Sequence, residues 1–267
     1  MGKKKIKSIY DEKIELIKKF NKQYYEKNKP SVSDSKYDEL KKEILSLEAS
    51  FKFLKSKDSP SKVVGYEPSK NFKKDFHRTP MLSLSNAFTE EDLINFEKKI
   101  LNFLSKDRNY KISYSAEPKI DGISASLNYK ILDKDFPKDI DIRGEVFIKN
   151  SDFEILKEKF ANPRNAASGS LRQKNPEDTK KIPLNFIAYS FGFEQGLKEK
   201  KQSDYLKKLD EWGFKINPLN KTISGIKNLI QNYNEVEQQR ANLDFDIDGI
   251  VYKINDFELQ KRLGNVA

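Results

Sequence analysis

In the first quarter of the chain, apolar residues recur every three or four positions, a spacing that predicts two amphipathic helices. Pro30 ends the first predicted helix, and Ser33 or Asp34 is suited to cap the second. We therefore expect residues 1–70 to form a small domain of two antiparallel helices. The two apolar stripes consist of Ile14, Ile17, Phe20 and Tyr24, and of Tyr37, Leu40, Ile44, Leu47 and Phe51.

Residues 71–267 combine helical and alternating patterns and form the second predicted domain. Thr89 and Asp92 make a capping box at the start of a helix. Ser151 and Ser203 are expected to cap two further helices, the second of which ends near Gly213. Alternating apolar residues predict strands on both sides of residue 119, at residues 140–148 and at residues 184–191. Because strands and helices do not alternate regularly, the pattern favours an α+β fold over a doubly wound sheet.

The composition is that of a folded and heavily charged protein. Hydrophobic residues make up 36% and aromatic residues 12% of the 267 residues, which is enough for a packed core. The net charge of +10 favours a polyanionic partner, although a general lysine bias explains the charge equally well. The absence of cysteine excludes disulfides and a cysteine-based zinc site in this chain. No apolar run reaches membrane-spanning length and the lysine-rich start lacks a signal core, so we expect a cytoplasmic location. Nothing in the sequence demands more than a monomer, which is the expected oligomeric state.

Lys119 lies between two predicted strands, just before Asp121 and Gly122, which are typical turn residues. A lysine amine can attack an electrophile only after it has lost its proton, and burial or a nearby cation favours the neutral form. Lys119 is therefore a candidate nucleophile. The alternative is an ordinary hairpin with a solvent-facing lysine, and these residues alone leave both readings open.

Residues 119–122 match the K-x-D-G motif of covalent nucleotidyltransferases, a group that includes DNA ligases, RNA ligases and capping enzymes. Four further segments accompany this motif in a defined order, and together they closely resemble the adenylation region of bacterial NAD-dependent DNA ligases over nearly the whole chain. The resemblance implies an ATP-grasp-like nucleotidyltransferase domain of antiparallel sheets with flanking helices, which follows the small helical domain. The four segments are residues 80–88, 142–147, 160–173 and 246–255.

The resemblance also implies a reaction. Lys119 would attack the adenylyl phosphate of NAD, form a lysine–AMP phosphoramidate and release nicotinamide mononucleotide. Asp121 and Glu145 would organise Mg²⁺ through water, because Mg²⁺ keeps much of its hydration shell. Lys253 would contact the phosphate of the adenylyl group. Without the resemblance, Asp121 is equally a turn residue and Glu145 an exposed strand residue.

Two groups of residues match the NAD-binding positions of this family. Ser83, Leu84 and Glu117 match positions around the adenosine, and Tyr189 is either a flat partner for adenine or a core aromatic. The helical domain matches the segment that holds the nicotinamide mononucleotide half, which ATP-dependent ligases lack, so the resemblance implies NAD rather than ATP. The matching residues there are Tyr24, Asp34, Ser35, Lys36, Tyr37 and Asp38, and Tyr37 also fits the core stripe.

Arg164 and Arg172 flank a run of small residues at 166–170. Arginine forms bidentate hydrogen bonds with phosphate, and small residues allow the backbone to approach a phosphodiester. We therefore expect this segment to bind nicked double-stranded DNA through backbone contacts whose affinity falls with salt. The alternative is a solvated loop.

The chain departs from the pattern of the family at several places. The connection after Tyr129 is short and lacks an arginine-glycine-aspartate-glycine stretch whose arginine contacts the adenosine in the family; the connection between Leu156 and Phe160 also looks short. The chain stops at Ala267, before a motif with a second lysine, and it lacks oligonucleotide-binding, zinc, helix-hairpin-helix and BRCT regions. We therefore expect an adenylation-domain fragment in which loop residues are missing.

Two other functions remain open from the sequence. One is an ATP-dependent nucleotidyltransferase, which would release pyrophosphate instead of nicotinamide mononucleotide. The other is a non-catalytic module that binds nucleotide or DNA with the same fold. The intact set of Lys119, Asp121, Glu145 and Lys253 argues against the non-catalytic module.

Overall fold

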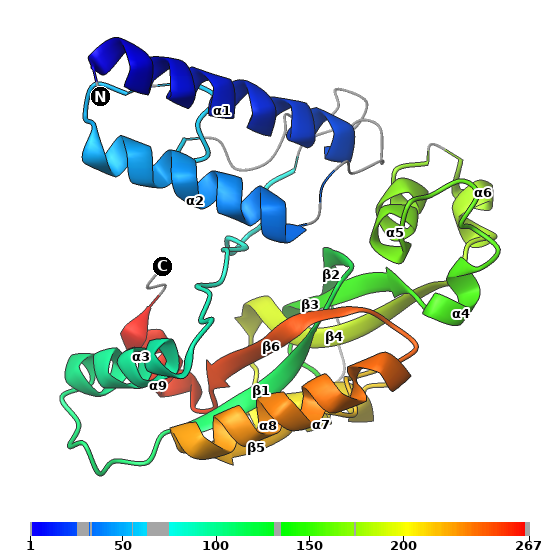
Figure 1. Ribbon diagram of the computed structural model, residues 1–267. Helices are drawn as coiled ribbons and strands as arrows, with labels where there is room; N and C mark the ends of the chain where they lie inside the picture. The colour runs from blue at the N-terminus through cyan, green and yellow to red at the C-terminus, as the bar shows by residue number, and fades with distance from the viewer. Residues whose placement is uncertain are drawn as a thin grey trace.

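A computed structural model describes residues 2–25, 32, 34–54, 56–62, 75–130, 135–173 and 175–264. The structure combines helices with two three-stranded antiparallel sheets, which confirms the predicted α+β class. The two N-terminal helices lie apart from the sheets (Figure 1).

The helical unit consists of α1 (Lys3–Tyr25) and α2 (Asp34–Ser50), whose apolar stripes pack against each other. The core includes Ile14, Ile17 and Ile44, each at most 4% exposed, as the helical spacing predicts. The predicted positions of Pro30 and Ser33 lie outside the described residues, as does the predicted domain boundary at residue 70. The boundary therefore stays a prediction.

The first sheet has the order β5-β1-β6 and is formed by β5 (Lys221–Ser224), β1 (Ser113–Ile120) and β6 (Ile247–Ile254). Three helices pack against it: α3 (Glu90–Phe103), α8 (Ile226–Gln239) and α9 (Phe257–Leu263). Their shared core contains Tyr114 of β1, which is fully buried. A short 3₁₀ turn, Arg240–Asn242, leads from α8 toward β6.

The second sheet has the order β2-β3-β4 and is formed by β2 (Ile123–Lys130), β3 (Asp139–Ile148) and β4 (Leu184–Gln195). The helix α7 (Gln202–Glu211) shares a core with β3 and β4. Three short helices lie at one end of this sheet: α4 (Asn150–Phe153), α5 (Pro163–Leu171) and α6 (Pro176–Lys180) (Figure 1).

The two sheets meet through a small apolar cluster. Ile120 of β1 packs with Phe147 of β3 and Ile187 of β4, and all three are less than 8% exposed. Burial of this kind stabilises the contact by about 25 cal/mol for each Å² of apolar surface removed from water. The cluster therefore holds the end of β1, and with it the residues that follow, against the second sheet.

Helix starts were predicted with mixed success. The capping box of Thr89 and Asp92 is present, because each side chain accepts a hydrogen bond from the backbone N–H of the other. The predictions for Ser151 and Ser203 were wrong, because α4 begins at Asn150 and α7 begins at Gln202. Both serines lie inside the first turn, where Ser151 donates to Asp244 and the Ser203 N–H donates to the side chain of Asn255.

Local patterns also missed whole elements. The helices α5, α6, α8 and α9 and the short strand β5 were not predicted. None of the helices in the described part of the chain is both long and apolar enough to cross a lipid bilayer.

The second sheet offers a direct test of this core. Ile142 of β3 is 1% exposed, whereas Ile155, which follows α4, is 77% exposed. Ile142→Ala should lower the free energy of unfolding by about 2–5 kcal/mol, because it removes buried apolar atoms and leaves a cavity. The same substitution at Ile155 is the matched control and should change it by less than about 0.5 kcal/mol. Urea unfolding measures both, and equal effects would contradict the packing described here.

Candidate active site

Polar and charged side chains from both sheets converge where β1 and β6 lie against β3 and β4. The predicted residues Lys119, Asp121, Glu145 and Lys253 all belong to this site, although they come from distant parts of the sequence. In Figure 1, β1 and β6 lie side by side, with the second sheet next to them. The pairing of the strands brings these side chains together.

Lys119 is the last outward-facing residue of β1, before a register shift between Lys119 and Ile120. Its Nζ donates a hydrogen bond to the carboxylate of Asp248, which comes from β6. The side chain of Lys119 is 45% exposed and that of Asp248 is 33% exposed, so the pair is accessible to a ligand. An ammonium group has no free electron pair, so Lys119 must give up a proton before it can act as a nucleophile.

The turn between β1 and β2 brings the K-x-D-G motif close to β3. A Cβ atom on Gly122 would lie 2.4 Å from the carbonyl oxygen of Val146 and 2.9 Å from Cγ of Glu145. Only glycine therefore allows this close approach. The backbone N–H of Asp121 donates to the carbonyl of Asp246, 2.9 Å away, which ties the turn to the residue before β6.

Asp121 is paired with an arginine. Nη1 of Arg164 donates to Asp121 Oδ1 at 2.7 Å, and the two side chains are 34% and 21% exposed. Arg164 belongs to α5, so the segment that sequence analysis read as a DNA contact or a solvated loop is a helix that directs this arginine into the site. The small residues Ala166 and Ala167 are fully buried against β3, so their size serves packing.

Glu145 of β3 faces the same group of charges. Ser124 of β2 donates to Glu145 Oε2 at 2.8 Å. Burial raises the pKa of Glu145 above its ordinary value. The hydrogen bond from Ser124 and the positive charges of Arg164 and Lys119 lower this pKa, but by less than burial raises it. The carboxylate of Asp121 is close enough to raise the pKa further.

Glu117 is the most buried charged residue of the site, with 4% exposure. It accepts hydrogen bonds from Ser115 Oγ at 2.8 Å, from Gln202 Nε2 at 2.9 Å and from Lys253 Nζ at 2.6 Å. A buried carboxylate requires such donors, because a charge without partners is very unfavourable away from water. Glu117 therefore links β1, β6 and α7.

Tyr189 of β4 lies beside Lys253. The ammonium of Lys253 is 5.2 Å from the centre of the tyrosine ring and donates to the Tyr189 carbonyl at 2.9 Å. The Tyr189 hydroxyl donates to Ser124 Oγ at 3.3 Å, and burial raises its pKa. Because Ser124 also contacts Glu145, Tyr189 is part of the polar site and not only a core aromatic.

The candidate adenosine contacts Ser83 and Leu84 lie in an exposed segment before α3. Arg143 of β3 anchors the start of this segment, because its guanidinium donates to the carbonyls of Thr79 and Pro80. The chain that leads to Ser83 and Leu84 is therefore attached to the second sheet at Thr79 and Pro80. Leu84 itself is 57% exposed.

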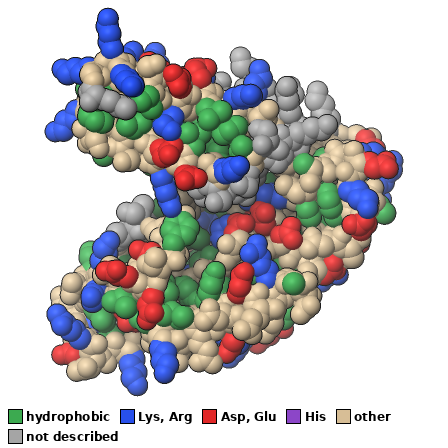
Figure 2. Space-filling model, in the orientation of Figure 1, with side chains coloured by type: hydrophobic (Ala, Val, Ile, Leu, Met, Phe, Trp, Pro, Cys, Tyr) green, Lys and Arg blue, Asp and Glu red, His purple; other side chains and the backbone are tan. Residues whose placement is uncertain are grey.

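The candidate contacts in the helical unit are only partly described. Tyr37 is half-buried and donates to Asn21 at 2.9 Å, so it fits the core stripe as predicted, while Lys36 is exposed. The side chains of Tyr24, Asp34, Ser35 and Asp38 lie outside the described part of the structure. Figure 2 shows a hollow between the helical unit and the sheets on this face. Arg172, the remaining candidate, is exposed at the end of α5.

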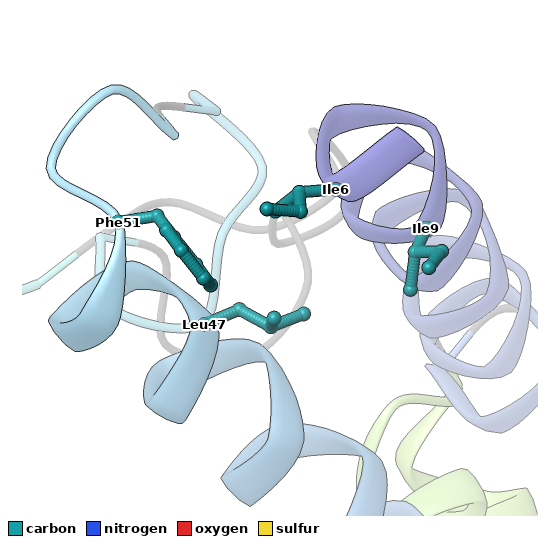
Figure 3. Close-up of a pocket in the computed structure, with 4 residues that line it drawn as sticks. All are labelled: Ile6, Ile9, Leu47 and Phe51. Carbon is teal, nitrogen blue, oxygen red and sulfur yellow. The ribbon is translucent and has the colours of Figure 1, made fainter. Parts of the chain in front are cut away.

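The described residues outside this site form neither a metal-binding cluster of side chains nor a hollow lined by reactive groups. Among the described residues, no three histidine or acidic side chains gather closely enough to hold a metal by themselves. Ile6, Ile9, Leu47 and Phe51 line an apolar hollow between α1 and α2 (Figure 3), which contains no group able to do chemistry. The charged site between the sheets is therefore the candidate active site.

Sequence reasoning missed Ser115, Ser124 and Gln202. Serine and glutamine are common surface residues, and no motif or spacing distinguishes these three from the others in the chain. Only the contacts with Glu117 and Glu145 show that they belong to the site.

Comparison with known sequences agrees with the composition of this site. The sequence model described as the NAD-dependent DNA ligase adenylation domain matches residues 69–131 and 130–267. A second, described as the DNA ligase-like, N-terminal NAD+-binding domain, matches residues 3–65. The two adenylation stretches meet just after Tyr129, at the connection that sequence analysis found to be short.

Similar curated proteins are named DNA ligase. The DNA ligase of Pelagibacter ubique is 56% identical over an alignment of 300 residues, and this alignment covers 100% of this chain and 44% of the relative. That of a Bradyrhizobium species is 40% identical over 284 residues, 91% of this chain and 40% of the relative. That of Dinoroseobacter shibae is 39% identical over 289 residues, 94% of this chain and 39% of the relative. The chain thus spans about two fifths of the length of the curated relatives it matches.

The adenylation match covers most of the chain and includes every strand of both sheets. It also includes the four charged residues that converge between the sheets. The chain therefore belongs to the NAD-dependent DNA ligase adenylation domain family.

Proposed function

We propose that this chain carries out the first half-reaction of an NAD-dependent DNA ligase. The neutral amine of Lys119 attacks the adenylyl phosphorus of NAD, and a phosphorus–nitrogen bond forms as the bond to the phosphate of nicotinamide mononucleotide breaks. The electron pair of the broken bond leaves with that phosphate. Bond formation gives the nitrogen a positive charge, and it then loses one proton. The product is a lysine–AMP phosphoramidate.

One observation carries this proposal: Lys119 lies at a half-exposed strand end, within a group of charged residues drawn from both sheets. Transfer of an adenylyl group depends mainly on positioning and on charge stabilisation. A lysine with a solvent path and with further cations from Arg164 and Lys253 in the same site meets both requirements. Membership of the family supports the same reaction.

Asp248 is the group placed to handle the proton of Lys119. Its carboxylate already accepts a hydrogen bond from Nζ, so it is within direct reach when the amine must become neutral. Lys253 is the proposed contact of the adenylyl phosphate. Its ammonium stays oriented by Glu117 and by the Tyr189 carbonyl while a phosphate approaches.

Mg²⁺ is part of the proposal, with Asp121 and Glu145 as the residues that would hold it through water. Glu145 is a carboxylate whose pKa is raised by burial and by the neighbouring Asp121, an arrangement that a divalent cation would relieve. Two carboxylates with water in the remaining positions suit an ion that keeps its hydration shell. A bound cation would supply neutralisation of phosphate charge.

For NAD recognition, we propose that Ser83, Leu84, Glu117 and Tyr189 surround the adenosine. The nicotinamide mononucleotide half would contact the helical unit, through Tyr24, Asp34, Ser35, Lys36, Tyr37 and Asp38. The match of residues 3–65 to a family described as NAD+-binding supports the assignment of this half. The finer fold assignment, an ATP-grasp-like nucleotidyltransferase domain, belongs to the same proposal.

The proposed macromolecular substrate is nicked double-stranded DNA, contacted by Arg172 and by Arg164 once the latter exchanges Asp121 for a phosphodiester. The net charge of +10 supports a polyanionic partner. By itself, a chain that spans about two fifths of its relatives should form the AMP intermediate but seal nicks poorly. A cytoplasmic location and a monomeric state complete the proposal.

An ATP-dependent transferase and a non-catalytic binding module are the competing functions. The family match favours NAD over ATP. Incubation with each nucleotide separates these possibilities, because release of nicotinamide mononucleotide supports the proposal and release of pyrophosphate contradicts it.

We predict that the chain gains the mass of one adenylyl group when it is incubated with NAD and Mg²⁺. Lys119→Ala should abolish this gain, because it removes the attacking nitrogen. Lys227→Ala, at an exposed position of α8, is the matched control and should retain it. Intact-protein mass spectrometry measures all three, and adenylation of the Lys119→Ala variant would exclude Lys119 as the nucleophile.

A second prediction follows from the raised pKa of Glu145. A carboxyl group whose pKa is higher in the folded than in the unfolded state contributes stability at low pH, and this contribution is lost as the pH rises through the folded pKa. Glu145→Gln should therefore raise the melting temperature near neutral pH, and the gain should disappear toward about pH 4. Its adenylation rate should nevertheless fall, because the carboxylate is lost.

Glu158→Gln, at an exposed position after α4, is the control for both measurements and should change neither. Thermal unfolding at several pH values gives the stability profile. A Glu145→Gln variant that is destabilised at neutral pH would show that the ionised carboxylate is favourable in the folded protein.

A further inference from the structure

Gln202 is a buried polar residue at the junction of the two sheets. It is the first residue of α7 and is 1% exposed. Its backbone N–H donates to the Asn255 carbonyl at 2.7 Å, and the next N–H, of Ser203, donates to the Asn255 side chain at 2.8 Å. The start of α7 is therefore held at the end of β6, and these hydrogen bonds fix the backbone position from which the Gln202 side chain extends.

The side-chain amide of Gln202 contacts the same two residues as Lys253. Nε2 donates to Glu117 Oε1 at 2.9 Å and to the Tyr189 carbonyl at 2.8 Å. Lys253 Nζ donates to Glu117 Oε2 at 2.6 Å and to the Tyr189 carbonyl at 2.9 Å. Two donors and two acceptors thus form a closed ring, which we call the Glu117 ring: Glu117, Tyr189, Gln202 and Lys253.

The chemistry of an amide suits this place. An amide supplies two N–H donors without charge. Gln202 therefore donates to one carboxylate oxygen of Glu117, and Lys253 remains the positively charged partner of Glu117. A lysine or arginine at this position would compete with Lys253, and an apolar residue would leave Glu117 and the Tyr189 carbonyl with fewer donors. Loss of a hydrogen bond to a buried charged group is costly, because the group cannot turn to water instead.

We propose that Gln202 is a positioning residue for the adenylyl group. It shares its two acceptors with Lys253 and so determines where the Lys253 ammonium lies, although it does not itself contact the nucleotide. This inference rests on the proposed function, in which Lys253 contacts the phosphate and Tyr189 lies against adenine. A purely structural role, in which Gln202 only joins α7 to the sheets, is the competing explanation.

The test is a double-mutant cycle on the full chain, with AMP as the probe and calorimetry as the measurement. Gln202→Met keeps the length of the side chain and removes both donors. We expect it to weaken AMP binding about tenfold, the effect of roughly one lost hydrogen bond to a charged group. In a Lys253→Met background the same change should have an effect of less than about twofold, because the residue through which Gln202 acts is gone.

Asn232→Leu is the matched control for loss of a buried side-chain amide. Asn232 is 4% exposed on α8, its Nδ2 has no hydrogen-bond partner in the described part of the chain, and it lies outside the Glu117 ring, so its substitution should leave AMP affinity unchanged. If Gln202→Met does not fold, Gln202→Asn withdraws the amide by one methylene and replaces it in the cycle with the same expectation.

The outcomes separate this inference from the proposed function. AMP affinity within twofold of wild type in the Gln202 variant, or an equal loss with and without Lys253, would overturn the positioning role while Lys119 is still adenylated. Wild-type chain that binds AMP but is never adenylated by NAD would overturn the proposed function, and the tenfold loss would still support Gln202. A wild-type chain that neither binds AMP nor is adenylated by NAD would overturn both.

Discussion

The antiparallel pairing of β1 with β6 is the constraint on which the site depends. It sets Lys119 opposite Gly249 and Ser115 opposite Lys253, so residues more than a hundred positions apart share one surface. Successive residues of a strand point to opposite faces, so a slip by one position would turn Lys253 away from Glu117. The small contact between Ile120, Phe147 and Ile187 then holds this pair of strands against the second sheet, where Glu145 and Tyr189 lie.

Two ion pairs of the site, Lys253 with Glu117 and Lys119 with Asp248, differ in how readily they exchange partners. Lys253 and Glu117 have side chains 20% and 5% exposed, and they are held by further hydrogen bonds. Separation of a buried pair is strongly unfavourable, because it leaves a charge without a partner. Lys119 and Asp248 are far more exposed, and such pairs contribute little to stability. Lys119, the proposed nucleophile, can therefore exchange its carboxylate partner for a phosphate more readily than Lys253, which is held by hydrogen bonds to Glu117 and to the Tyr189 carbonyl.

The segment between the helical unit and α3 is anchored to the same sheet that carries Glu145. Arg78 pairs with Asp139 and Asp141 of β3, and Arg143 of β3 holds the carbonyls of Thr79 and Pro80. Further along, the ammonium of Lys42 in α2 lies 4.1 Å from the centre of the Phe88 ring. The helical unit thus meets the sheets through a segment with a defined attachment, close to the residues proposed to bind the adenosine.

Local patterns were enough to predict the α+β class, the strands around Lys119 and the charged residues of the candidate site, because alternation, helical spacing and the K-x-D-G motif involve only neighbouring positions. The motif also contains Gly122, but the reason that only glycine fits there is the close approach of the Val146 carbonyl oxygen, which the fold creates. The partner of each charged side chain, in contrast, follows only from the folded arrangement. Arg164 reaches Asp121 because residues 163–171 form a helix packed on β3, and Gln202 reaches Glu117 because α7 starts where β6 ends. Such contacts join residues far apart in the chain, and no local pattern carries information about a partner that only folding brings near.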